Sequence, residues 1–376
     1  MPSKSAAVDG QPTVVNCDRH SSRWLIEPGR ASTKVQRVLV TGISGNLGRR
    51  VAPLLIGYDL VTVDLHPPPK DVACGEFVQL DLSARAGQEE LARLLKSRNI
   101  EAVLHLAFII DPVRTGIEDV PRMWQVNVAA TQRLLKAVAD ANSNGTAVRL
   151  FVFPSSVSAY GPDLPASVTE EAELLAHTLP YAVHKREADE ICQKMYPSLG
   201  GCALYVYRPS IFAGKTMDNF ILRAIRGKPS GRGWLARAFE RAGWKLPMVM
   251  PASASGENLF QYVHVDDVAR VLQWTLEHFR PGHLKIINLA GRGEGVTFAE
   301  CARLAGTPVI HLPSEKWVVA LLRMMWAIGL SGMPPQVIPY FLGSYTMDTS
   351  RLREEIGADY ECVVRYTSRE ALLDSF

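Results

Sequence analysis

The sequence has little excess charge of either sign. Its 41 lysines and arginines are nearly balanced by 38 aspartates and glutamates, which gives a net charge of +3. Because nucleic-acid-binding proteins usually carry a strongly basic face, this balance argues against that class and favours a small-molecule partner. The chain has 376 residues, of which 47% are hydrophobic, and is long enough for one large α/β domain or for two domains that share a cleft.

Cysteines are few, and none stands in a CxxC pair or in a Cys/His cluster with metal-ligand spacing. This scatter argues against a disulfide scaffold and against a zinc site, so we expect no metal. We expect reduced, mostly packed thiols in a cytoplasmic protein. The six cysteines are Cys17, Cys74, Cys192, Cys202, Cys301 and Cys362.

Long hydrophobic runs are also missing. Residues 1–34 are rich in Ser, Pro, Gly, Asp and Arg and lack the apolar core of a signal peptide, so we expect a flexible leader. The most apolar stretch, from Trp317 to Leu330, contains Arg323 and is shorter than the roughly 20 residues of a membrane span. We expect it to form a buried helix or a lid.

From Val35 onward, short β-branched runs alternate with longer helical patterns. Strands separated by helices predict right-handed crossovers and a parallel sheet covered on both faces, with ligands bound at the carboxyl ends of the strands. After about Arg208 this alternation ends in a Gly-, Pro- and Arg-rich stretch. We therefore predict an α/β fold with a Rossmann-type, doubly wound domain over 35–208, to which 257–292 returns, and a smaller, mostly helical substrate lobe from 209–256 and 293–376.

Three glycines follow the first predicted strand, in the stretch LVTGISGNLGRR. A surface turn is one interpretation. At a strand-to-helix junction, Gly42 permits a tight turn, Gly45 lets backbone N–H groups approach a pyrophosphate, and Gly48 allows close helix packing. Asp64 ends the second strand 22 positions after Gly42 (64 minus 42). A carboxylate at roughly this offset binds ribose hydroxyls and repels the 2′-phosphate of NADP, so the pattern predicts a site that prefers NAD over NADP.

A tyrosine and a lysine lie one helical turn apart in the stretch YAVHK, at Tyr181 and Lys185. An ordinary surface pair is the alternative for this spacing alone. A cation beside a phenol lowers the tyrosine pKa from about 10, so Tyr181 could exchange a proton with a substrate hydroxyl near neutral pH. The pair follows the glycine loop and the stretch PSSVSAYG, and we therefore predict a catalytic site.

Other polar residues have simpler interpretations. Asp266 and Asp267 precede a helical pattern and are expected to cap that helix. We expect His264 and His105 to be packed histidines of strands rather than catalytic bases.

Further motifs occur in order along the chain from about Val35 to Gly357. Besides the glycine loop and YAVHK, they are DL at Asp81 and Leu82, HLA at 105–107, NV at Asn127 and Val128, SSVSAYG, RPSIFAG, YVHVDDVAR and MDTSRLREEIG. Together they resemble the motifs of the extended short-chain dehydrogenase/reductase superfamily, in its NAD-dependent epimerase/dehydratase group.

The resemblance implies roles for individual residues. Tyr181 would be the general acid/base, Ser156 would hydrogen-bond the substrate oxygen, and Lys185 would bind the nicotinamide ribose and tune Tyr181. Hydride would pass between a substrate carbon and the nicotinamide. A homodimer is a further expectation. The residues expected to bind the cofactor are Gly42, Ser44, Gly45, Asn46, Leu47, Gly48, Asp64, Asp81, Leu82, Leu106, Ala107, Asn127, Ser155, Tyr181, Lys185 and Pro209.

Three positions on the expected substrate side differ from the nucleotide-sugar epimerases of this family. Phe260 stands where they carry an arginine that reaches the diphosphate, Ile211 where an asparagine is frequent, and Phe108 where a small residue is usual. Without its arginine, a diphosphate pocket would leave charge unpaired. We therefore predict an oxidoreductase that interconverts a secondary alcohol and a ketone on a lipophilic, steroid-, terpenoid- or acyl-like substrate. The alternatives are a sugar-nucleotide epimerase or dehydratase with tightly bound NAD, and a dinucleotide-sensing binding protein.

The stretch from Arg223 to Lys245 has seven basic residues and one acid, Glu240, interleaved with Trp234, Leu235, Phe239 and Trp244. It could bind a phosphate-bearing substrate. It could also lie on an anionic membrane surface, with Trp317 to Leu330 as a second contact. A solvated basic helix whose apolar face packs in the core is the third interpretation.

Overall fold

A parallel β-sheet lies at the centre of the protein in a computed structural model that describes residues 35–84, 86–110, 119–162, 164–251, 258–341 and 343–376. The predicted leader, residues 1–34, lies outside this part of the chain. Neighbouring strands are parallel throughout the order β11-β6-β5-β4-β1-β2-β3, which is the predicted Rossmann-type sheet. The strands are β1 (Arg37–Thr41), β2 (Asp59–Asp64), β3 (Glu76–Gln79), β4 (Ala102–His105), β5 (Leu150–Pro154), β6 (Ala203–Pro209) and β11 (Leu284–Leu289).

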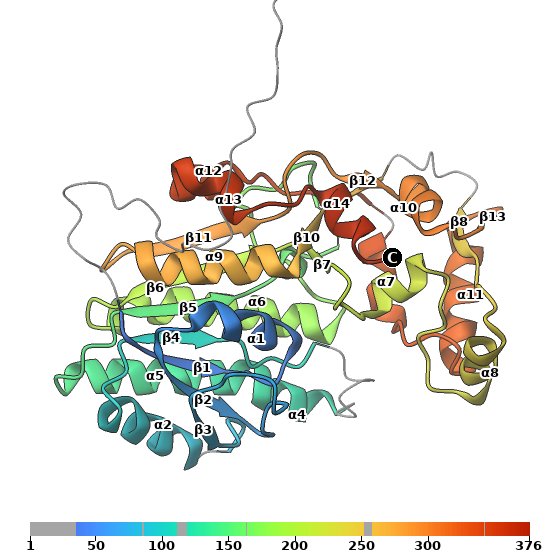
Figure 1. The fold of residues 1–376 in the computed structure, drawn as a ribbon. Helices are drawn as coiled ribbons and strands as arrows, with labels where there is room; N and C mark the ends of the chain where they lie inside the picture. The colour runs from blue at the N-terminus through green and yellow to red at the C-terminus, as the bar shows by residue number, and fades with distance from the viewer. Residues whose placement is uncertain (1–34, 85, 111–118, 163, 252–257, 342) are drawn as a thin grey trace, which may run out of the picture. The chain divides into compact units, whose positions relative to one another are not determined.

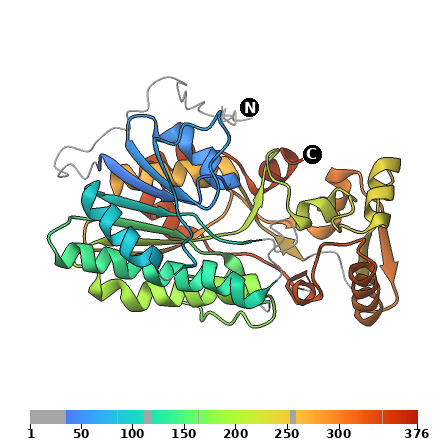
Figure 2. The ribbon, with the colours of Figure 1, turned by 90° about the horizontal axis from the view of Figure 1, so that it is seen from below.

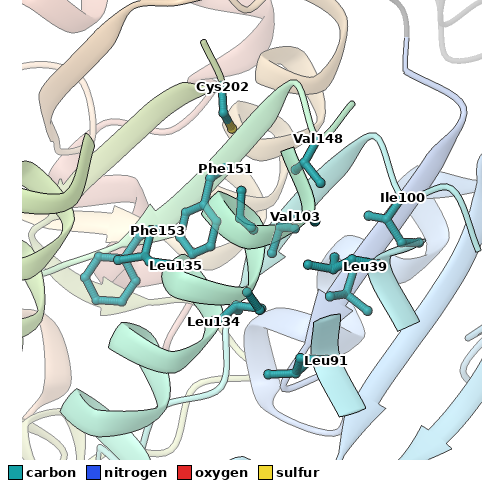
Figure 3. Close-up of a cluster of buried hydrophobic side chains, with 14 of the residues drawn as sticks. Leu39, Leu91, Ile100, Val103, Leu134, Leu135, Val148, Phe151, Phe153 and Cys202 are labelled. Atoms are coloured by element: carbon teal, nitrogen blue, oxygen red, sulfur yellow. The ribbon is translucent and has the colours of Figure 1, made fainter. Parts of the chain in front are cut away.

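Helices cover both faces of the sheet (Figures 1 and 2). Over one face, α5 (Ala130–Ser143) packs between α2 (Ala86–Ser97) and α6 (Pro180–Met195), whereas α1 (Asn46–Val51) and α9 (Val265–His278) pair on the other. Because both faces are covered, β5 and β6 are buried along their whole length, and their sequences are almost entirely apolar. Figure 3 shows Phe151 and Phe153 of β5 in the same buried cluster as Leu134 and Leu135 of α5.

The chain order reverses at β1, which pairs with β2 on one side and with β4 on the other. In open α/β sheets a ligand crevice forms outside the carboxyl ends of the strands at such a point. His105, the last residue of β4, is buried between Thr41 and Thr131, whose hydroxyls lie 2.7 and 2.9 Å from its ring nitrogens. It is therefore a packed histidine, as expected.

The contact between α1 and α9 includes an ion pair in which Arg50 donates to both carboxylate oxygens of Asp266, at 2.5 and 2.6 Å. Asp266 and Asp267 lie inside the first turn of α9 and do not cap it. The cap is the ring of His264, whose Nδ1 accepts a hydrogen bond from the Asp266 N–H at 3.1 Å. The predicted cap is thus displaced by two residues.

The second half of the chain adds helices and short strand pairs around a second buried cluster, which includes Phe260, Tyr340 and Tyr345. The strand pairs are β7 (Ile211–Ala213) with β10 (Tyr262–His264), β9 (Leu259–Phe260) with β12 (Val296–Thr297), and β8 (Met248–Pro251) with β13 (Val309–Leu312). The helices are α7 (Phe220–Ile225), α8 (Trp234–Ala242), α10 (Phe298–Ala305), α11 (Glu315–Ala327), α12 (Ser350–Ile356), α13 (Tyr360–Val363) and α14 (Ser368–Leu373), while α4 (Val120–Trp124) precedes α5.

The apolar stretch from Trp317 to Leu330 forms most of α11 and the residues after it, and Val318 is the one buried residue of that helix. It is therefore not a buried helix, whereas the expected lid stays a prediction. The expectation that the cysteines are reduced is wrong for one of them. Cys362 is disulfide-bonded, whereas Cys74, Cys192, Cys202 and Cys301 are free thiols. Of the helices in the described ranges, none is long and apolar enough to cross a membrane.

Candidate active site

A cavity of about 490 Å³ opens at the carboxyl ends of β1, β4, β5 and β6. We call it the catalytic cavity. It brings together the glycine loop, the predicted catalytic residues and the predicted substrate residues. The predicted residues that line it are Gly42, Gly45, Asn46, Leu47, Gly48, Leu106, Phe108, Ser155, Ser156, Tyr181, Lys185, Pro209, Ile211 and Phe260.

The glycine loop packs closely against neighbouring backbone beside the cavity, and side chains would not fit at two of its positions. Gly42 has a φ of +77°, and a Cβ on it would lie 2.5 Å from the backbone nitrogen of Ala107. A Cβ on Gly48 would lie 2.5 Å from the Gly42 carbonyl oxygen. Gly45 is extended and exposed at the start of α1. The loop therefore fits the cradle that a dinucleotide pyrophosphate requires.

Asp64 ends β2 beside this loop. Its carboxylate accepts hydrogen bonds from the backbone N–H groups of Ser44 at 3.0 Å and Leu65 at 2.7 Å. These bonds fix the acid near the loop, although Asp64 and Ser44 do not line the catalytic cavity. The predicted cofactor residues Asp81, Leu82 and Ala107 do not line the catalytic cavity either. Asp81 accepts hydrogen bonds from the backbone N–H and the hydroxyl of Ser83.

Asn127 has a buried, supporting position. It lies in a π-helical turn (Gln125–Ala129) between α4 and α5, and such turns are frequent at functional sites. Its side chain accepts from the Ile109 N–H at 2.7 Å and donates to the Ile109 carbonyl at 3.0 Å. Asn127 thus holds the segment after β4 and does not reach the cavity itself.

Tyr181 and Ser156 meet at the cavity wall. Pro180 begins α6, which places Tyr181 in the first turn. Burial raises the pKa of Tyr181 to about 12, and a hydrogen bond with Ser156 opposes that rise. The predicted lowering of the Tyr181 pKa is therefore wrong. Burial raises this pKa by more than the Ser156 hydrogen bond lowers it, and the Lys185 ammonium contacts the Pro154 carbonyl instead of the phenol. The phenol keeps its proton at neutral pH.

Ser158 orients Ser156. The Ser156 Oγ accepts hydrogen bonds from the Ser158 backbone N–H at 3.1 Å and from the Ser158 hydroxyl at 2.9 Å. Since a hydroxyl has two acceptor positions and one donor, both lone pairs of Ser156 are used. Its own proton remains for Tyr181 or for a substrate oxygen.

Lys185 lies under the cavity floor. Its ammonium donates to the Pro154 carbonyl at 2.5 Å and lies 3.6 Å from the ring centroid of Phe108 and 4.7 Å from that of Phe153. Those contacts favour the charged form. Burial opposes them and lowers the pKa of Lys185 to about 7. Phe108 also meets the Tyr181 ring edge-on at 5.9 Å, so this large residue supports both catalytic side chains.

Further hydroxyls that the sequence did not point to face the same cavity. The side-chain oxygens of Ser210 and Tyr345 are buried and have no hydrogen-bond partner among the described residues, as is also true of Ser155. Burial, with the nearby phenols of Tyr340 and Tyr181, raises the pKa of Tyr345. Tyr345 reaches the site because its backbone pairs with β9 through the N–H bond to the Leu259 carbonyl.

The substrate side of the cavity is apolar. Phe260 is buried and packs against Phe298 and Phe341, with ring centroids 6.0 and 6.1 Å apart. Among the described residues that line the catalytic cavity, Lys185 alone carries a charge. Behind Phe260 lies a second cavity of about 150 Å³, which shares Ile221, Phe260 and Phe341 with the first.

The basic stretch does not supply the missing arginine within the described lining. Arg223 is paired with both carboxylate oxygens of Asp218, at 2.8 and 2.9 Å. Arg226 donates to the backbone carbonyls of Met217 and Ser375. Lys228 lines the second cavity but not the catalytic one.

Comparison with known proteins places these features in a family. The trifunctional UDP-glucose 4,6-dehydratase/UDP-4-keto-6-deoxy-D-glucose 3,5-epimerase/UDP-4-keto-L-rhamnose-reductase RHM2 of Arabidopsis thaliana is 26% identical over 273 residues, which are 67% of this chain and 36% of that protein. An uncharacterized epimerase/dehydratase of Staphylococcus saprophyticus is 23% identical over 172 residues, 44% of this chain and 50% of that protein. The chain thus spans between a third and a half of the length of these relatives.

Solved structures share the fold. MoeE5 in complex with UDP-glucuronic acid and NAD matches with a TM-score of 0.60 and 23% identity, over 90% of this chain and 97% of that one. UDP-glucose 4-epimerase from Brucella ovis in complex with NAD matches with a TM-score of 0.61 and 22% identity, over 90% and 99% of the two chains. A family model described as "NAD dependent epimerase/dehydratase family" matches residues 38–290. The chain therefore belongs to the NAD-dependent epimerase/dehydratase family, whose members are enzymes of the short-chain dehydrogenase/reductase type.

Proposed function

We propose that this chain is a sugar-nucleotide epimerase or dehydratase, in which a hydride leaves a hydroxyl-bearing carbon of the substrate and later returns to the same substrate molecule. One observation supports it most: the catalytic cavity joins Ser156, Tyr181 and Lys185 to a loop that fits a dinucleotide. The activity of the Arabidopsis thaliana relative and the UDP-glucuronic acid bound by MoeE5 favour sugar nucleotides over the lipophilic substrates expected from the sequence.

The residues divide the chemistry between them. The loop with Gly42, Gly45 and Gly48 would hold NAD, which would supply the hydride acceptor for the substrate carbon. The protonated phenol of Tyr181 fits the reduction step, in which it donates its proton to the substrate oxygen, whereas in the oxidation step its phenolate form accepts the hydroxyl proton as the carbonyl forms. Ser156 donates its free proton to the substrate oxygen, where negative charge develops. Lys185 donates to the Pro154 carbonyl at the end of β5, so it holds the strand end that precedes Ser155 and Ser156.

We further propose that NAD is preferred over NADP. The carboxylate of Asp64 is held at the end of β2 by the N–H of Ser44, one residue before Gly45. A negative charge fixed there disfavours a 2′-phosphate. Arg49 of α1 donates to the Ser44 carbonyl at 2.8 Å.

A second candidate is a net dehydrogenase for a lipophilic alcohol or ketone. It is favoured by the apolar lining around Phe260, where the described residues offer a diphosphate no arginine. An unpaired diphosphate in such surroundings would be costly.

Thermal unfolding of the purified protein tests both the cofactor and the substrate class. A ligand at 100 times its dissociation constant stabilises the fold by about 2.7 kcal/mol. We expect NAD to raise the melting temperature more than NADP does, and UDP to raise it further with NAD present. A rise with lipophilic ketones or alcohols but none with UDP would establish the second candidate instead. No rise with either dinucleotide would contradict the cofactor assignment. The predicted homodimer is checked by the mass in solution.

A further inference from the structure

Three exposed tryptophans gather at one part of the molecule. Trp234, Trp244 and Trp317 have exposed fractions of 75%, 64% and 63%. They lie on or beside α8 and α11. Both views show these two helices far from the seven-stranded sheet (Figures 1 and 2). A group of exposed apolar side chains, unlike a single one, is typical of an interaction surface.

The outward face of α11 exposes large apolar side chains beside the cations Lys316 and Arg323. Trp317, Met324 and Ile328 are all exposed, and their spacing of seven and four residues places them along one side of the helix and its end. The inward side is apolar as well, because Val318, Leu322 and Met325 line the second cavity. A surface helix normally has a polar outer face. The helix therefore has apolar side chains on both sides, together with cations on the outer one.

The outward face of α8 combines an aromatic ring with cations. Trp234, Arg237 and Arg241 are exposed at positions i, i+3 and i+7 of one face. Trp244 follows the helix and packs edge-on against Phe239, with centroids 5.3 Å apart. The sequence alternative of a solvated basic helix does not explain why this face also exposes Trp234.

Tight backbone contacts join the two helices. The Gly233 N–H donates to the Gly329 carbonyl at 2.9 Å, and the Gly231 N–H donates to the Leu330 carbonyl at 3.1 Å. A Cβ on Gly231 would lie 2.1 Å from the Gly329 carbonyl oxygen, so glycine is needed for this approach. The start of α8 and the end of α11 therefore form one connected structure.

The charge of this structure is positive. Its exposed cations outnumber its exposed acids, which are Glu240 and Glu315, and Glu240 lies 3.6 Å from Arg223. The ammonium of Lys245 donates to the carbonyls that end α10 and remains exposed. The exposed cations are Arg232, Arg237, Arg241, Lys245, Lys316 and Arg323. We call these cations together with Trp234, Trp244, Trp317, Met324 and Ile328 the aromatic-basic surface.

We propose that the aromatic-basic surface docks on an anionic lipid bilayer. Exposed tryptophans favour the level of the headgroups, and arginines and lysines are attracted to anionic lipids. Because α11 also lines both cavities through its inward side and Trp326, docking would place cavity walls next to the bilayer. The proposal goes beyond the proposed function and does not depend on which reaction the cavity performs.

Co-sedimentation with vesicles tests the proposal on the full chain with NAD. One set of vesicles contains phosphatidylcholine alone, and the other contains equal parts of phosphatidylcholine and phosphatidylglycerol. We expect the protein to sediment with the mixed vesicles, to bind phosphatidylcholine much more weakly, and to be released as salt screens the cations. A protein that stays in the supernatant with mixed vesicles at low ionic strength would overturn the proposal.

Paired substitutions locate the binding surface. Arg237→Ala with Arg241→Ala should weaken binding to the mixed vesicles about 30-fold, if each cation contributes as is usual at such surfaces. Trp234→Ser with Trp317→Ser tests insertion separately and should weaken binding to both kinds of vesicle. Lys136→Ala with Lys194→Ala, on exposed positions of α5 and α6, is the matched control and should change nothing.

Two results would contradict this location. One is a control pair that loses as much binding as the arginine pair. The other is a wild-type protein that binds a polyuridylate probe but neither kind of vesicle, because the surface would then serve a nucleic acid. An unchanged rise of the melting temperature with NAD shows that each variant is folded.

Discussion

The two sides of the catalytic cavity differ in how their residues are assembled. On the cofactor side, the glycine loop, Ser156, Tyr181 and Lys185 come from short stretches that end strands or begin helices. Backbone groups hold several of them, such as the Pro154 carbonyl that binds Lys185. On the substrate side, Ile211, Phe260, Trp326 and Tyr345 come from distant parts of the chain and are mostly apolar.

This difference separates the reaction from the choice of substrate. The cofactor side contains every group that the proposed proton transfer needs, and these groups are fixed by hydrogen bonds within β5, α6 and the turn between them. The substrate side contributes shape and a few hydroxyls. A substitution on the cofactor side should therefore alter turnover, and a substitution on the substrate side should alter stability and substrate affinity.

The largest effect is expected from Tyr181→Phe. Loss of the proton-transferring hydroxyl should lower kcat by about 10²- to 10⁴-fold, measured with the compound that the thermal screen identifies. The rise of the melting temperature with NAD should persist, because the ring and the glycine loop remain. Tyr196→Phe, at the far end of α6, is the control and should keep its turnover. Unchanged turnover in Tyr181→Phe would show that Tyr181 does not transfer the proton.

The second prediction concerns Phe260, the wall between the two cavities. Phe260→Ala should lower the free energy of unfolding by about 3–5 kcal/mol, because a buried ring is lost and the cavities join. Denaturant unfolding measures this change. Phe151→Ala in the sheet core is the matched control and should be similarly destabilised. Only the Phe260 variant should also change the melting-temperature shift caused by the substrate. If both variants keep that shift, Phe260 is a core residue and not a substrate residue.

The cofactor side was largely predictable from the sequence because its geometry is local. The position of Gly42 after β1 and the spacing of Tyr181 and Lys185 on α6 depend on one strand end and one helical turn. The parallel sheet followed from alternating apolar runs. The direction of the Tyr181 pKa was not predictable, since spacing alone does not include burial or the turn of Lys185 toward Pro154.

The substrate side was less predictable because it depends on tertiary pairing. Tyr345 lies 85 residues from Phe260 in the sequence (345 minus 260), and a backbone bridge brings the two together. No spacing pattern in the sequence predicts such a contact. The apolar composition of α11 likewise predicted a buried helix, although the apolar residues Trp317, Met324 and Ile328 are exposed.

A smaller effect is expected in the pH dependence of stability. Since burial lowers the pKa of Lys185 from 10.5 to about 7, the unfolded chain binds more protons than the folded one between these pH values. Lys185 should therefore make the stability rise as the pH increases from about 7 to 10.5, by at most about 5 kcal/mol. Unfolding across this range should show the rise in wild type and lose it in Lys185→Met. Lys194→Met, an exposed lysine of the same helix, should keep it.

The smallest effect is expected from Tyr345→Phe, and it tests the substrate side most finely. The Tyr345 hydroxyl is buried without a partner among the described residues, so its removal should leave the free energy of unfolding unchanged within about 0.5 kcal/mol. If that hydroxyl binds substrate, KM should rise about threefold to tenfold, as the loss of one hydrogen bond predicts. Tyr160→Phe is the opposite control. Its hydroxyl donates to Asn288 at 2.8 Å and accepts from Arg208 at 2.9 Å, so the loss should appear in stability instead. A Tyr345 variant that loses stability but keeps its KM would mean that this side of the cavity is packing alone.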